Sequence, residues 1–237
     1  MKPFVRTGLA WSAVAAILSA GLSLWTIGAL PEGGEFPIHW GLDGQPDRLA
    51  PRSAAAAMLM VMPGVILFTG ILLAVVPALD PRKGNIEKGR KAYLATWIGT
   101  ALLLAGVHAG ICMATLRTSG VAGLPNDVVR YVIAACGLLI IVIGNYTPKT
   151  RPSFLFGVRT PWTLSSDFAW EKTHRLAGPL FMGAGALGMV GAFLFHGIWL
   201  ALQLSALIGT AVLISVVYSY FAWKTAGDRD DGTSLTV

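Results

Sequence analysis

Hydrophobic residues along the chain gather into six long runs, which short polar segments separate. Each run is close to or above the length of about 20 apolar residues that lets a helix cross the hydrocarbon core of a bilayer. Backbone groups left unpaired in lipid are costly, so such runs form helices. The pattern predicts six transmembrane helices, at residues 8–30, 54–79, 92–116, 128–145, 179–195 and 198–223.

Composition agrees with a membrane protein. Hydrophobic residues make up 54% of the chain and charged residues only 13%, whereas a soluble domain carries about 25% charged residues. The net charge of +6 would suit a nucleic-acid partner, but the basic residues lie in short clusters between the apolar runs and form no continuous stripe. We therefore expect membrane lipids as partners and no direct binding of nucleic acid.

The distribution of Lys and Arg predicts the orientation. Six crossings place both chain ends on one side, and 14 of the 18 Lys and Arg residues fall in the segments on that side. Segments with positive charge next to a helix stay in the cytoplasm. We predict an all-α, multi-pass protein of the bacterial cytoplasmic (inner) membrane. Both termini and the loop 144–178 are then cytoplasmic, and a small extracytoplasmic loop, 31–52, joins the first two helices.

Three regions follow from this arrangement. Residues 1–79 hold the first two helices with the outer loop, and residues 80–224 form a helical bundle with the long cytoplasmic loop. The polar residues 225–237 are expected to form a disordered tail. Within the fifth run, small residues recur every four positions and predict a flat face for close helix contact. These residues are Ala184, Gly188 and Ala192.

The segment 144–178 is too polar to cross a bilayer and too distinctive in composition to be a simple linker. Its prolines restrict the backbone, Gly157 permits a turn, and the serines before Asp167 can cap a helix that continues into the fifth run. Trp162 and Trp170 are amphipathic enough to lie at the membrane interface. Its Lys and Arg residues can bind anionic lipid or an acidic protein surface. The alternative is a positively charged loop with interfacial anchors and no partner.

The outer loop predicts a small hairpin over the mouth of the bundle, because an extended piece precedes a tight Asp-Gly turn. Three of its residues, His39, Asp43 and Asp47, are metal ligands by type. An extended chain passing through a turn does not place them on one face, and their spacing matches no established metal motif. We therefore expect no metal site. The candidate ligand-binding residues of this loop are His39, Trp40, Asp43, Asp47 and Arg48.

His108 lies well inside the third run. An ionisable group at this depth is a functional candidate, although a neutral histidine bonded to a carbonyl on a neighbouring helix explains it equally well. His108, Pro63 in the second run and the glycine-rich fifth run motivate an alternative function, a transporter or exporter of a small molecule or peptide. No Asp or Glu occurs in the middle of a run, which weighs against proton-coupled transport.

Motifs for catalysis are missing from the sequence. It contains no HExxH, GxSxG or P-loop pattern. A Thr173-His174 pair is weak evidence for a catalytic site. We expect no enzymatic activity, no catalytic residues and no cofactor.

Two stretches resemble a known family. The long loop is similar to the hallmark of the SdpI family of bacterial membrane proteins, and the outer loop resembles the DUF1648 region found at the start of such proteins. Ser153 departs from the Asn that the pattern places after the Arg-Pro pair. The residues that carry the first resemblance are Gly144-Asn145, Pro148-Lys149, Arg151-Pro152, the run from Gly157 to Leu164, Trp170, Thr173-His174 and Gly178. Those that carry the second are Pro37-Ile38-His39-Trp40, Gly44, Pro46, Asp47 and Arg48.

The resemblance implies a multi-span immunity protein that protects a producing cell from a secreted toxic peptide. It further implies signalling, in which a small helix-turn-helix autorepressor is held at the membrane. We accordingly expect the toxic peptide to bind from outside, at the outer loop, and the autorepressor to bind at the cytoplasmic loop. The expected partner-binding residues of the cytoplasmic loop are Asn145, Pro148, Lys149, Arg151, Pro152, Gly157, Arg159, Pro161, Trp162, Thr163, Trp170, Thr173 and His174.

Overall fold

The computed structural model describes residues 1–41, 46–82, 84–117 and 126–228. It contains six helices long and apolar enough to cross a membrane, as the hydrophobic runs predict. These helices are α1 (Pro3–Ala29), α2 (Arg52–Leu79), α4 (Arg90–Arg117), α5 (Asn126–Tyr146), α7 (Asp167–Leu194) and α8 (Ile198–Lys224). The shorter elements are β1 (Glu35–Trp40), β2 (Pro46–Pro51), α3 (Asn85–Lys88), the 3₁₀ helix η1 (Thr147–Lys149) and α6 (Pro161–Leu164).

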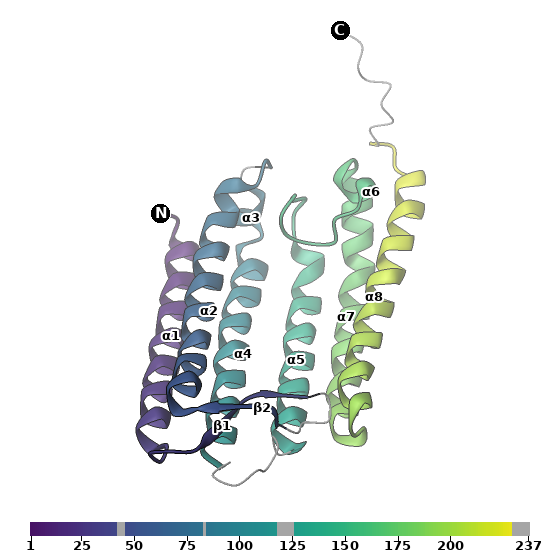
Figure 1. The fold of residues 1–237 in the computed structure, drawn as a ribbon. Coiled ribbons are helices and arrows are strands. Elements are labelled where there is room, and N and C mark those ends of the chain that lie inside the picture. Colours follow the sequence, from purple (N-terminus) through teal and green to yellow (C-terminus); the bar gives the residue numbers. More distant parts are fainter. Residues whose placement is uncertain (42–45, 83, 118–125, 229–237) are drawn as a thin grey trace.

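The bundle has two distinct ends (Figure 1). The chain start, the end of α8 and the short helices α3 and α6 lie at one end, which we call the loop end. The strands β1 and β2 lie at the opposite end, which we call the hairpin end. The two loops singled out in the sequence are therefore separated by the full length of the long helices.

The long helices form two groups of three. In the first, α1 packs against α2 and α4; in the second, α5 packs against α7 and α7 against α8. The two groups meet at α4 and α5, which contact one another less extensively than α5 and α7 do. In the first group, Trp97 of α4 donates a hydrogen bond from Nε1 to Ser12 Oγ of α1 at 2.8 Å. The two helix groups are thus joined through a smaller helix contact than the one between α5 and α7.

Small residues let α7 pack closely on both of its neighbours. Toward α5, a Cβ added to Gly137 would come within 2.7 Å of the Gly185 carbonyl oxygen. Toward α8, a Cβ added to Gly188 would meet the side chain of Leu204 at 2.4 Å. The small-residue face expected from the sequence is confirmed, since its members Ala184, Gly188 and Ala192 are all buried.

The predicted hairpin is present. β1 and β2 pair antiparallel, and they are the only strands in the part of the chain that the structure describes. Phe36 in β1 is 2% exposed and forms a buried cluster with Leu30 and Ala55. This cluster attaches the hairpin to α1 and α2, so the hairpin is a fixed part of an otherwise helical fold.

The chain after α8 contacts the bundle at residues 225–228, which the sequence assigned to a disordered tail. Ala226 is buried. The Asp228 carboxylate accepts hydrogen bonds from Ser166 Oγ at 2.6 Å and from the Phe168 amide at 3.1 Å. A carboxylate is favoured at this place because the first amides of α7 are free to donate. The rest of the expected tail, 229–237, lies outside the described residues.

Candidate functional site

A buried carboxylate fastens the long loop to the end of α2. Asp80 is 1% exposed, and its Oδ2 accepts hydrogen bonds from Ser153 Oγ at 2.5 Å and from the amides of Phe154 and Leu155 at 3.0 and 3.1 Å. Its Oδ1 accepts from the Arg82 amide at 2.8 Å. Hydrogen bonds to a carboxylate satisfy the desolvated charge, which would otherwise be costly at this position.

Ser153, the position that departs from the family pattern, takes part in this arrangement directly. Its hydroxyl donates to Asp80 and accepts from the amides of Leu155 and Phe156 at 3.2 and 3.1 Å. A serine hydroxyl can donate once and accept twice. Ser153 therefore makes all three hydrogen bonds available to a serine hydroxyl and closes the turn at 153–156.

Further polar contacts join the α2–α3 turn to the same loop. Arg82 pairs with Asp167 at 2.6 Å and donates to the Leu164 carbonyl oxygen at 2.8 Å. Asn85 donates from Nδ2 to the Pro152 carbonyl oxygen at 2.8 Å. Sequence reasoning missed Asp80, Arg82 and Asn85. The available signal was an acidic residue placed directly at the end of an apolar run, where a solvated lysine or arginine is the commoner occupant.

Inside the loop, His174 and Trp170 form a buried stack. Their rings lie 4.0 Å apart at 17°, and both side chains are 1% exposed. His174 Nε2 accepts the Val158 amide hydrogen at 2.9 Å, and Nδ1 lies 2.8 Å from the Trp170 carbonyl oxygen. These partners fix the tautomer with the hydrogen on Nδ1. His174 thus holds the loop backbone on α7.

Gly157 is required next to this stack. Its φ is +120°, and an added Cβ would lie 2.7 Å from both His174 Nε2 and Trp170 Cη2. Only glycine combines this backbone conformation with so close an approach. The sequence predicted a turn here, and the structure shows that the turn presses the backbone onto the ring stack.

A pair of threonines shapes the next part of the loop. Thr160 caps α6 by accepting from the Thr163 amide at 3.1 Å, and Thr163 Oγ1 in return accepts from the Thr160 amide at 2.9 Å. This reciprocal arrangement is a capping box. Thr160 Oγ1 also lies 3.0 Å from Ser219 Oγ, which ties the loop to α8. The loop is therefore held by α2, α7 and α8 together.

The thirteen residues expected to bind a partner divide by exposure. Buried residues cannot touch a partner in this conformation, so they position the loop. Thr163, Trp170, Thr173 and His174 are buried, and Pro152 and Trp162 are half-buried; Asn145, Pro148, Lys149, Arg151, Gly157, Arg159 and Pro161 are exposed. Trp170 was expected at the membrane interface, and its burial against His174 contradicts that expectation. Trp162 instead lies against Tyr220, with ring centroids 5.2 Å apart.

At the hairpin end, His39 Nδ1 lies 2.6 Å from Asp47 Oδ1. The sequence-based expectation that these residues do not share a face is therefore wrong. The strand register places His39 opposite Arg48, and it is irregular on both sides of His39. Such an irregularity re-aims side chains. His39, Asp47 and Arg48 are exposed and Trp40 is half-buried, whereas Asp43 lies outside the described residues.

The described part of the chain holds no group of three or more His, Cys, Asp or Glu side chains that could bind a metal ion. The His39–Asp47 pair supplies two groups, and their side chains are 63% and 52% exposed. An ion pair this exposed adds little to stability, at most about 1 kcal/mol. The pair is better suited to shaping the hairpin surface.

His108 occupies the interior of the first helix group. It is fully buried, and its Nε2 lies 2.9 Å from Ser23 Oγ and 3.4 Å from Cys112 Sγ. Ser23 Oγ also lies 2.9 Å from the Leu59 carbonyl oxygen. The serine hydroxyl therefore connects α1 with α2 and α4 at one point. The partner of His108 on the neighbouring helix is thus a serine hydroxyl, whereas the sequence predicted a carbonyl.

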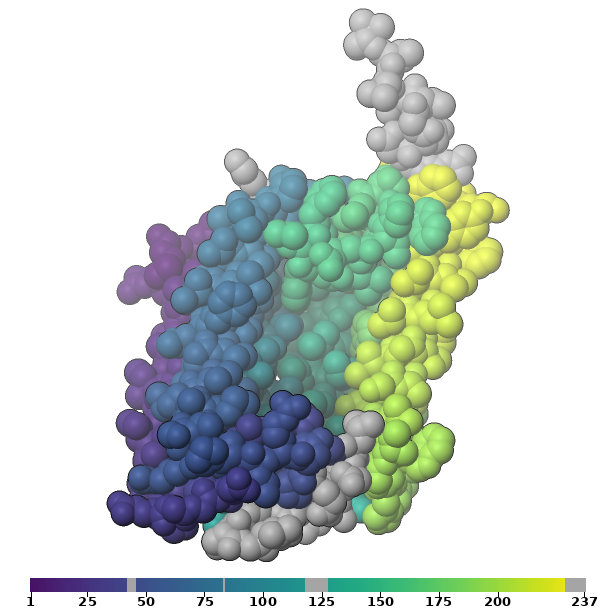
Figure 2. Space-filling view, viewed as in Figure 1, coloured from purple at the N-terminus to yellow at the C-terminus, as the bar shows by residue number. Residues whose placement is uncertain are grey.

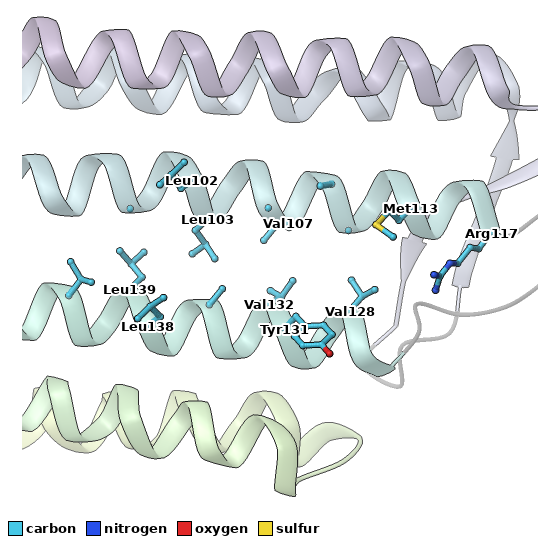
Figure 3. Close-up of a pocket in the computed structure, with 16 residues that line it drawn as sticks. Leu102, Leu103, Val107, Met113, Arg117, Val128, Tyr131, Val132, Leu138 and Leu139 are labelled. Carbon is cyan, nitrogen blue, oxygen red and sulfur yellow. The ribbon is translucent and has the colours of Figure 1, made fainter.

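An apolar groove of about 820 Å³ runs along the seam between α4 and α5 (Figure 3). The two helices approach closely where Gly99 faces Leu139 and where Gly110 faces Val128, while no atom lies within 4 Å of a Cβ added to Gly106. The seam is thus open between two points of contact. Arg117 and Tyr131 line the groove at the hairpin end (Figure 3).

Comparison with known proteins gives two family matches and one relative. The model of the SdpI/YfhL protein family matches residues 149–219, and that of the domain of unknown function DUF1648 matches residues 14–63. The chain is also similar to Immunity protein SdpI of Bacillus subtilis (strain 168), with 25% identity over 195 residues, 82% of this chain and 86% of the relative. The chain resembles the SdpI family in both of these matched regions. No solved structure matches it.

The two family matches cover different parts of the chain. The DUF1648 match includes the hairpin, and the SdpI match includes most of the long loop with α7. Asp80, Arg82 and Asn85 lie in neither match. The contacts that fasten the loop to α2 are thus supplied by a part of the chain that the family models do not describe.

Proposed function

We propose that this multi-pass membrane protein confers resistance to a secreted toxic peptide and that its loop end docks a cytoplasmic helix-turn-helix autorepressor. The observation that carries the proposal is its similarity to an immunity protein along 82% of the chain. The matched family regions include both the hairpin and the long loop. The membrane is the bacterial inner membrane in this proposal, with the loop end in the cytoplasm, because 14 of the 18 Lys and Arg residues lie on that side.

The hairpin end offers a peptide two kinds of surface. The hairpin carries exposed polar side chains, His39, Asp47 and Arg48, on a rigid ribbon attached through Phe36. The groove between α4 and α5 is almost wholly apolar, and it has Arg117 at its hairpin end. A membrane-active peptide has both apolar and polar side chains. We propose that the hairpin contacts the polar face of the peptide. The groove, which is open to the lipid, would take up the apolar side chains of the peptide.

The loop end offers a cationic face of defined shape. We call the exposed residues Asn145, Pro148, Lys149, Arg151, Arg159 and Pro161 the docking face. Its three basic residues suit an acidic surface on a protein partner. The buried Thr163, Trp170, Thr173 and His174 act indirectly, since they hold the backbone that presents this face. We propose that the docking face binds the autorepressor.

Binding at the hairpin end can affect binding at the loop end only through a structural element whose conformation depends on both ends. The seam between α4 and α5 reaches from the hairpin end toward the loop end, and the helix groups on its two sides are joined at the loop end by Asp80, Arg82 and Asn85. A peptide bound in the seam would change the position of one helix group relative to the other. We propose that the change reaches the docking face through these polar contacts.

Two sets of variants test the division of roles. Replacing Lys149 and Arg151 by Glu reverses the charge of the docking face, and replacing Lys172 and Arg175 by Glu is the matched control on exposed cations of α7. Membrane recruitment of a small helix-turn-helix repressor, co-expressed with the protein, is measured by co-fractionation. The first pair should abolish recruitment, and the control should retain it. Equal recruitment by both pairs would contradict the docking role.

Transport of a small molecule or peptide is the second candidate function, and the groove between α4 and α5 is the observation in its favour. His108 no longer supports it specifically, because that residue bonds within the first helix group and is not among the residues that line the groove. Substrate flux into proteoliposomes that a Gly106→Trp substitution abolishes would favour transport over immunity. A protein that protects cells without any such flux would favour immunity.

A further inference from the structure

A second cavity, of about 450 Å³, lies beneath the loop segment 156–159 at the loop end. Figure 2 shows the surface hollowed below this loop, between the blue α2 and the yellow α8. The cavity lies between the two helix groups, since its walls come from α4 on one side and from α5, α7 and α8 on the other. Its lining includes Thr96, Tyr146, Thr150, Arg159, Phe181 and Val216.

The lining changes in character from the loop toward the middle of the bundle. Near the loop it is lined by Tyr146, Thr150 and Arg159, while Phe181 of α7 and Val212 and Val216 of α8 form the deeper wall. Arg159 is the one charged residue among those that line the cavity. A site with a cationic rim and an apolar wall suits an amphiphile with an anionic head.

The geometry of Arg159 leaves it able to bind an anion. Its Nη1 donates to the Phe154 carbonyl oxygen at 3.0 Å, which holds the side chain beside the cavity. A guanidinium has five N–H donors, so most of them remain for a ligand. A second cation lies at the same rim, because Lys149 Nζ is 4.9 Å from the ring centroid of Tyr146. A phosphate group at this rim would be bound by charge-assisted hydrogen bonds.

We infer that this cavity binds one anionic phospholipid, with its phosphate at Arg159 and Lys149 and an acyl chain along Phe181, Val212 and Val216. Basic pockets between transmembrane helices are known sites for anionic lipid headgroups. The apolar wall argues for a lipid and against a free phosphate ion, which would leave that wall without a partner. Val212 is 43% exposed, so an acyl chain can continue from the cavity into the surrounding bilayer.

A lipid in this place would join the two helix groups. Ala92 and Thr96 belong to α4, whereas the remaining helical residues of the lining belong to the second group or to η1 at its end. The direct contact between α4 and α5 is limited, so the lipid would supply part of the junction at the loop end. The inference shares Lys149 and Arg159 with the docking face, but it is tested without any toxin or repressor.

The test is lipid retention by the purified full chain. The protein is exchanged into detergent containing equal amounts of phosphatidylglycerol and phosphatidylcholine, and bound lipid is counted by native mass spectrometry. The wild type should retain one phosphatidylglycerol in preference to phosphatidylcholine. Arg159→Gln should lower this preference about fivefold, the change expected for one cation near a headgroup. Val216→Trp should remove retention of both lipids, because the indole fills the apolar part of the cavity.

Controls separate this site from general surface charge. Arg175→Gln removes an exposed cation of α7 that does not line the cavity, and it should leave the preference unchanged. Thermal unfolding shows whether Val216→Trp remains folded, and Val212→Trp serves as the second cavity-filling variant. Equal retention of the two lipids by the wild type would overturn the inference. So would an equal effect of Arg159→Gln and Arg175→Gln, or release of the lipid by inorganic phosphate or an acidic peptide alone.

Discussion

Asp80, at the end of α2, and Ser153, in the long loop, are 73 positions apart and share a buried hydrogen bond. The same carboxylate accepts two loop amides, Phe154 and Leu155. This contact joins the first helix group to the segment that carries the family hallmark. The loop is therefore an ordered surface whose shape depends on α2, and its position is fixed before any partner binds.

Asp80→Ala should destabilise the protein strongly. The substitution leaves a buried hydroxyl and two amides without their acceptor, which we expect to lower the free energy of unfolding by about 2 to 4 kcal/mol. Thermal unfolding in detergent measures the loss. Glu171→Ala, at an exposed site of α7, is the control and should change stability by less than about 0.5 kcal/mol. Equal midpoints for the two variants would show that Asp80 does not anchor the loop.

Gly157→Ala should loosen the loop while the bundle stays intact. The new Cβ would meet His174 and Trp170 at 2.7 Å in a backbone conformation that alanine rarely adopts, at a cost of about 1–3 kcal/mol. Limited proteolysis should then cut within 150–160 faster than in the wild type. Gly183→Ala is the matched control, because no atom lies within 4 Å of its added Cβ. Unchanged cleavage of Gly157→Ala would contradict the described packing.

Asp228 should make a contribution to stability that depends on pH. The hydrogen bond from Ser166 lowers the pKa of Asp228 below its usual value. A depressed pKa means that the stabilisation is present above the usual pKa of an aspartate, about 4, and is lost as the pH falls through the lower folded value. Wild type and Asp228→Asn should therefore differ in unfolding midpoint at pH 6, and the difference should shrink as the pH falls below about 4. A difference that grows toward low pH would have the wrong sign.

The fold could be predicted from the sequence further than the site could. Runs of apolar residues specify six helices because lipid permits few other structures, and the Asp-Gly turn predicts a hairpin. The contacts of Asp80 could not be predicted, because they join residues 73 positions apart and depend on how the long loop lies against the end of α2. The meeting of His39 and Asp47 was missed because the strand register is irregular beside His39. Trp170 was misplaced because composition alone does not distinguish an interfacial tryptophan from a buried one.

The orientation can be tested with single cysteines. After Cys112 and Cys136 are replaced by Ala, a cysteine is introduced at the exposed position 48 in the hairpin or 171 at the loop end. A thiol reagent that does not cross membranes should label Arg48→Cys in intact cells and Glu171→Cys only after lysis. The positive charge of the loop end predicts this outcome. Labelling of position 171 in intact cells would contradict the proposed topology and place the loop end outside the cell.

Survival of cells is the most direct test of the central claim. A sensitive bacterium with and without the intact protein is challenged with a secreted toxic peptide, at equal amounts of membrane-inserted protein for every variant. The account predicts that the wild type protects, that the double substitution of His39 and Arg48 by Ala loses protection, and that Lys149→Glu with Arg151→Glu retains it. Equal killing with and without the wild-type protein would contradict the immunity function.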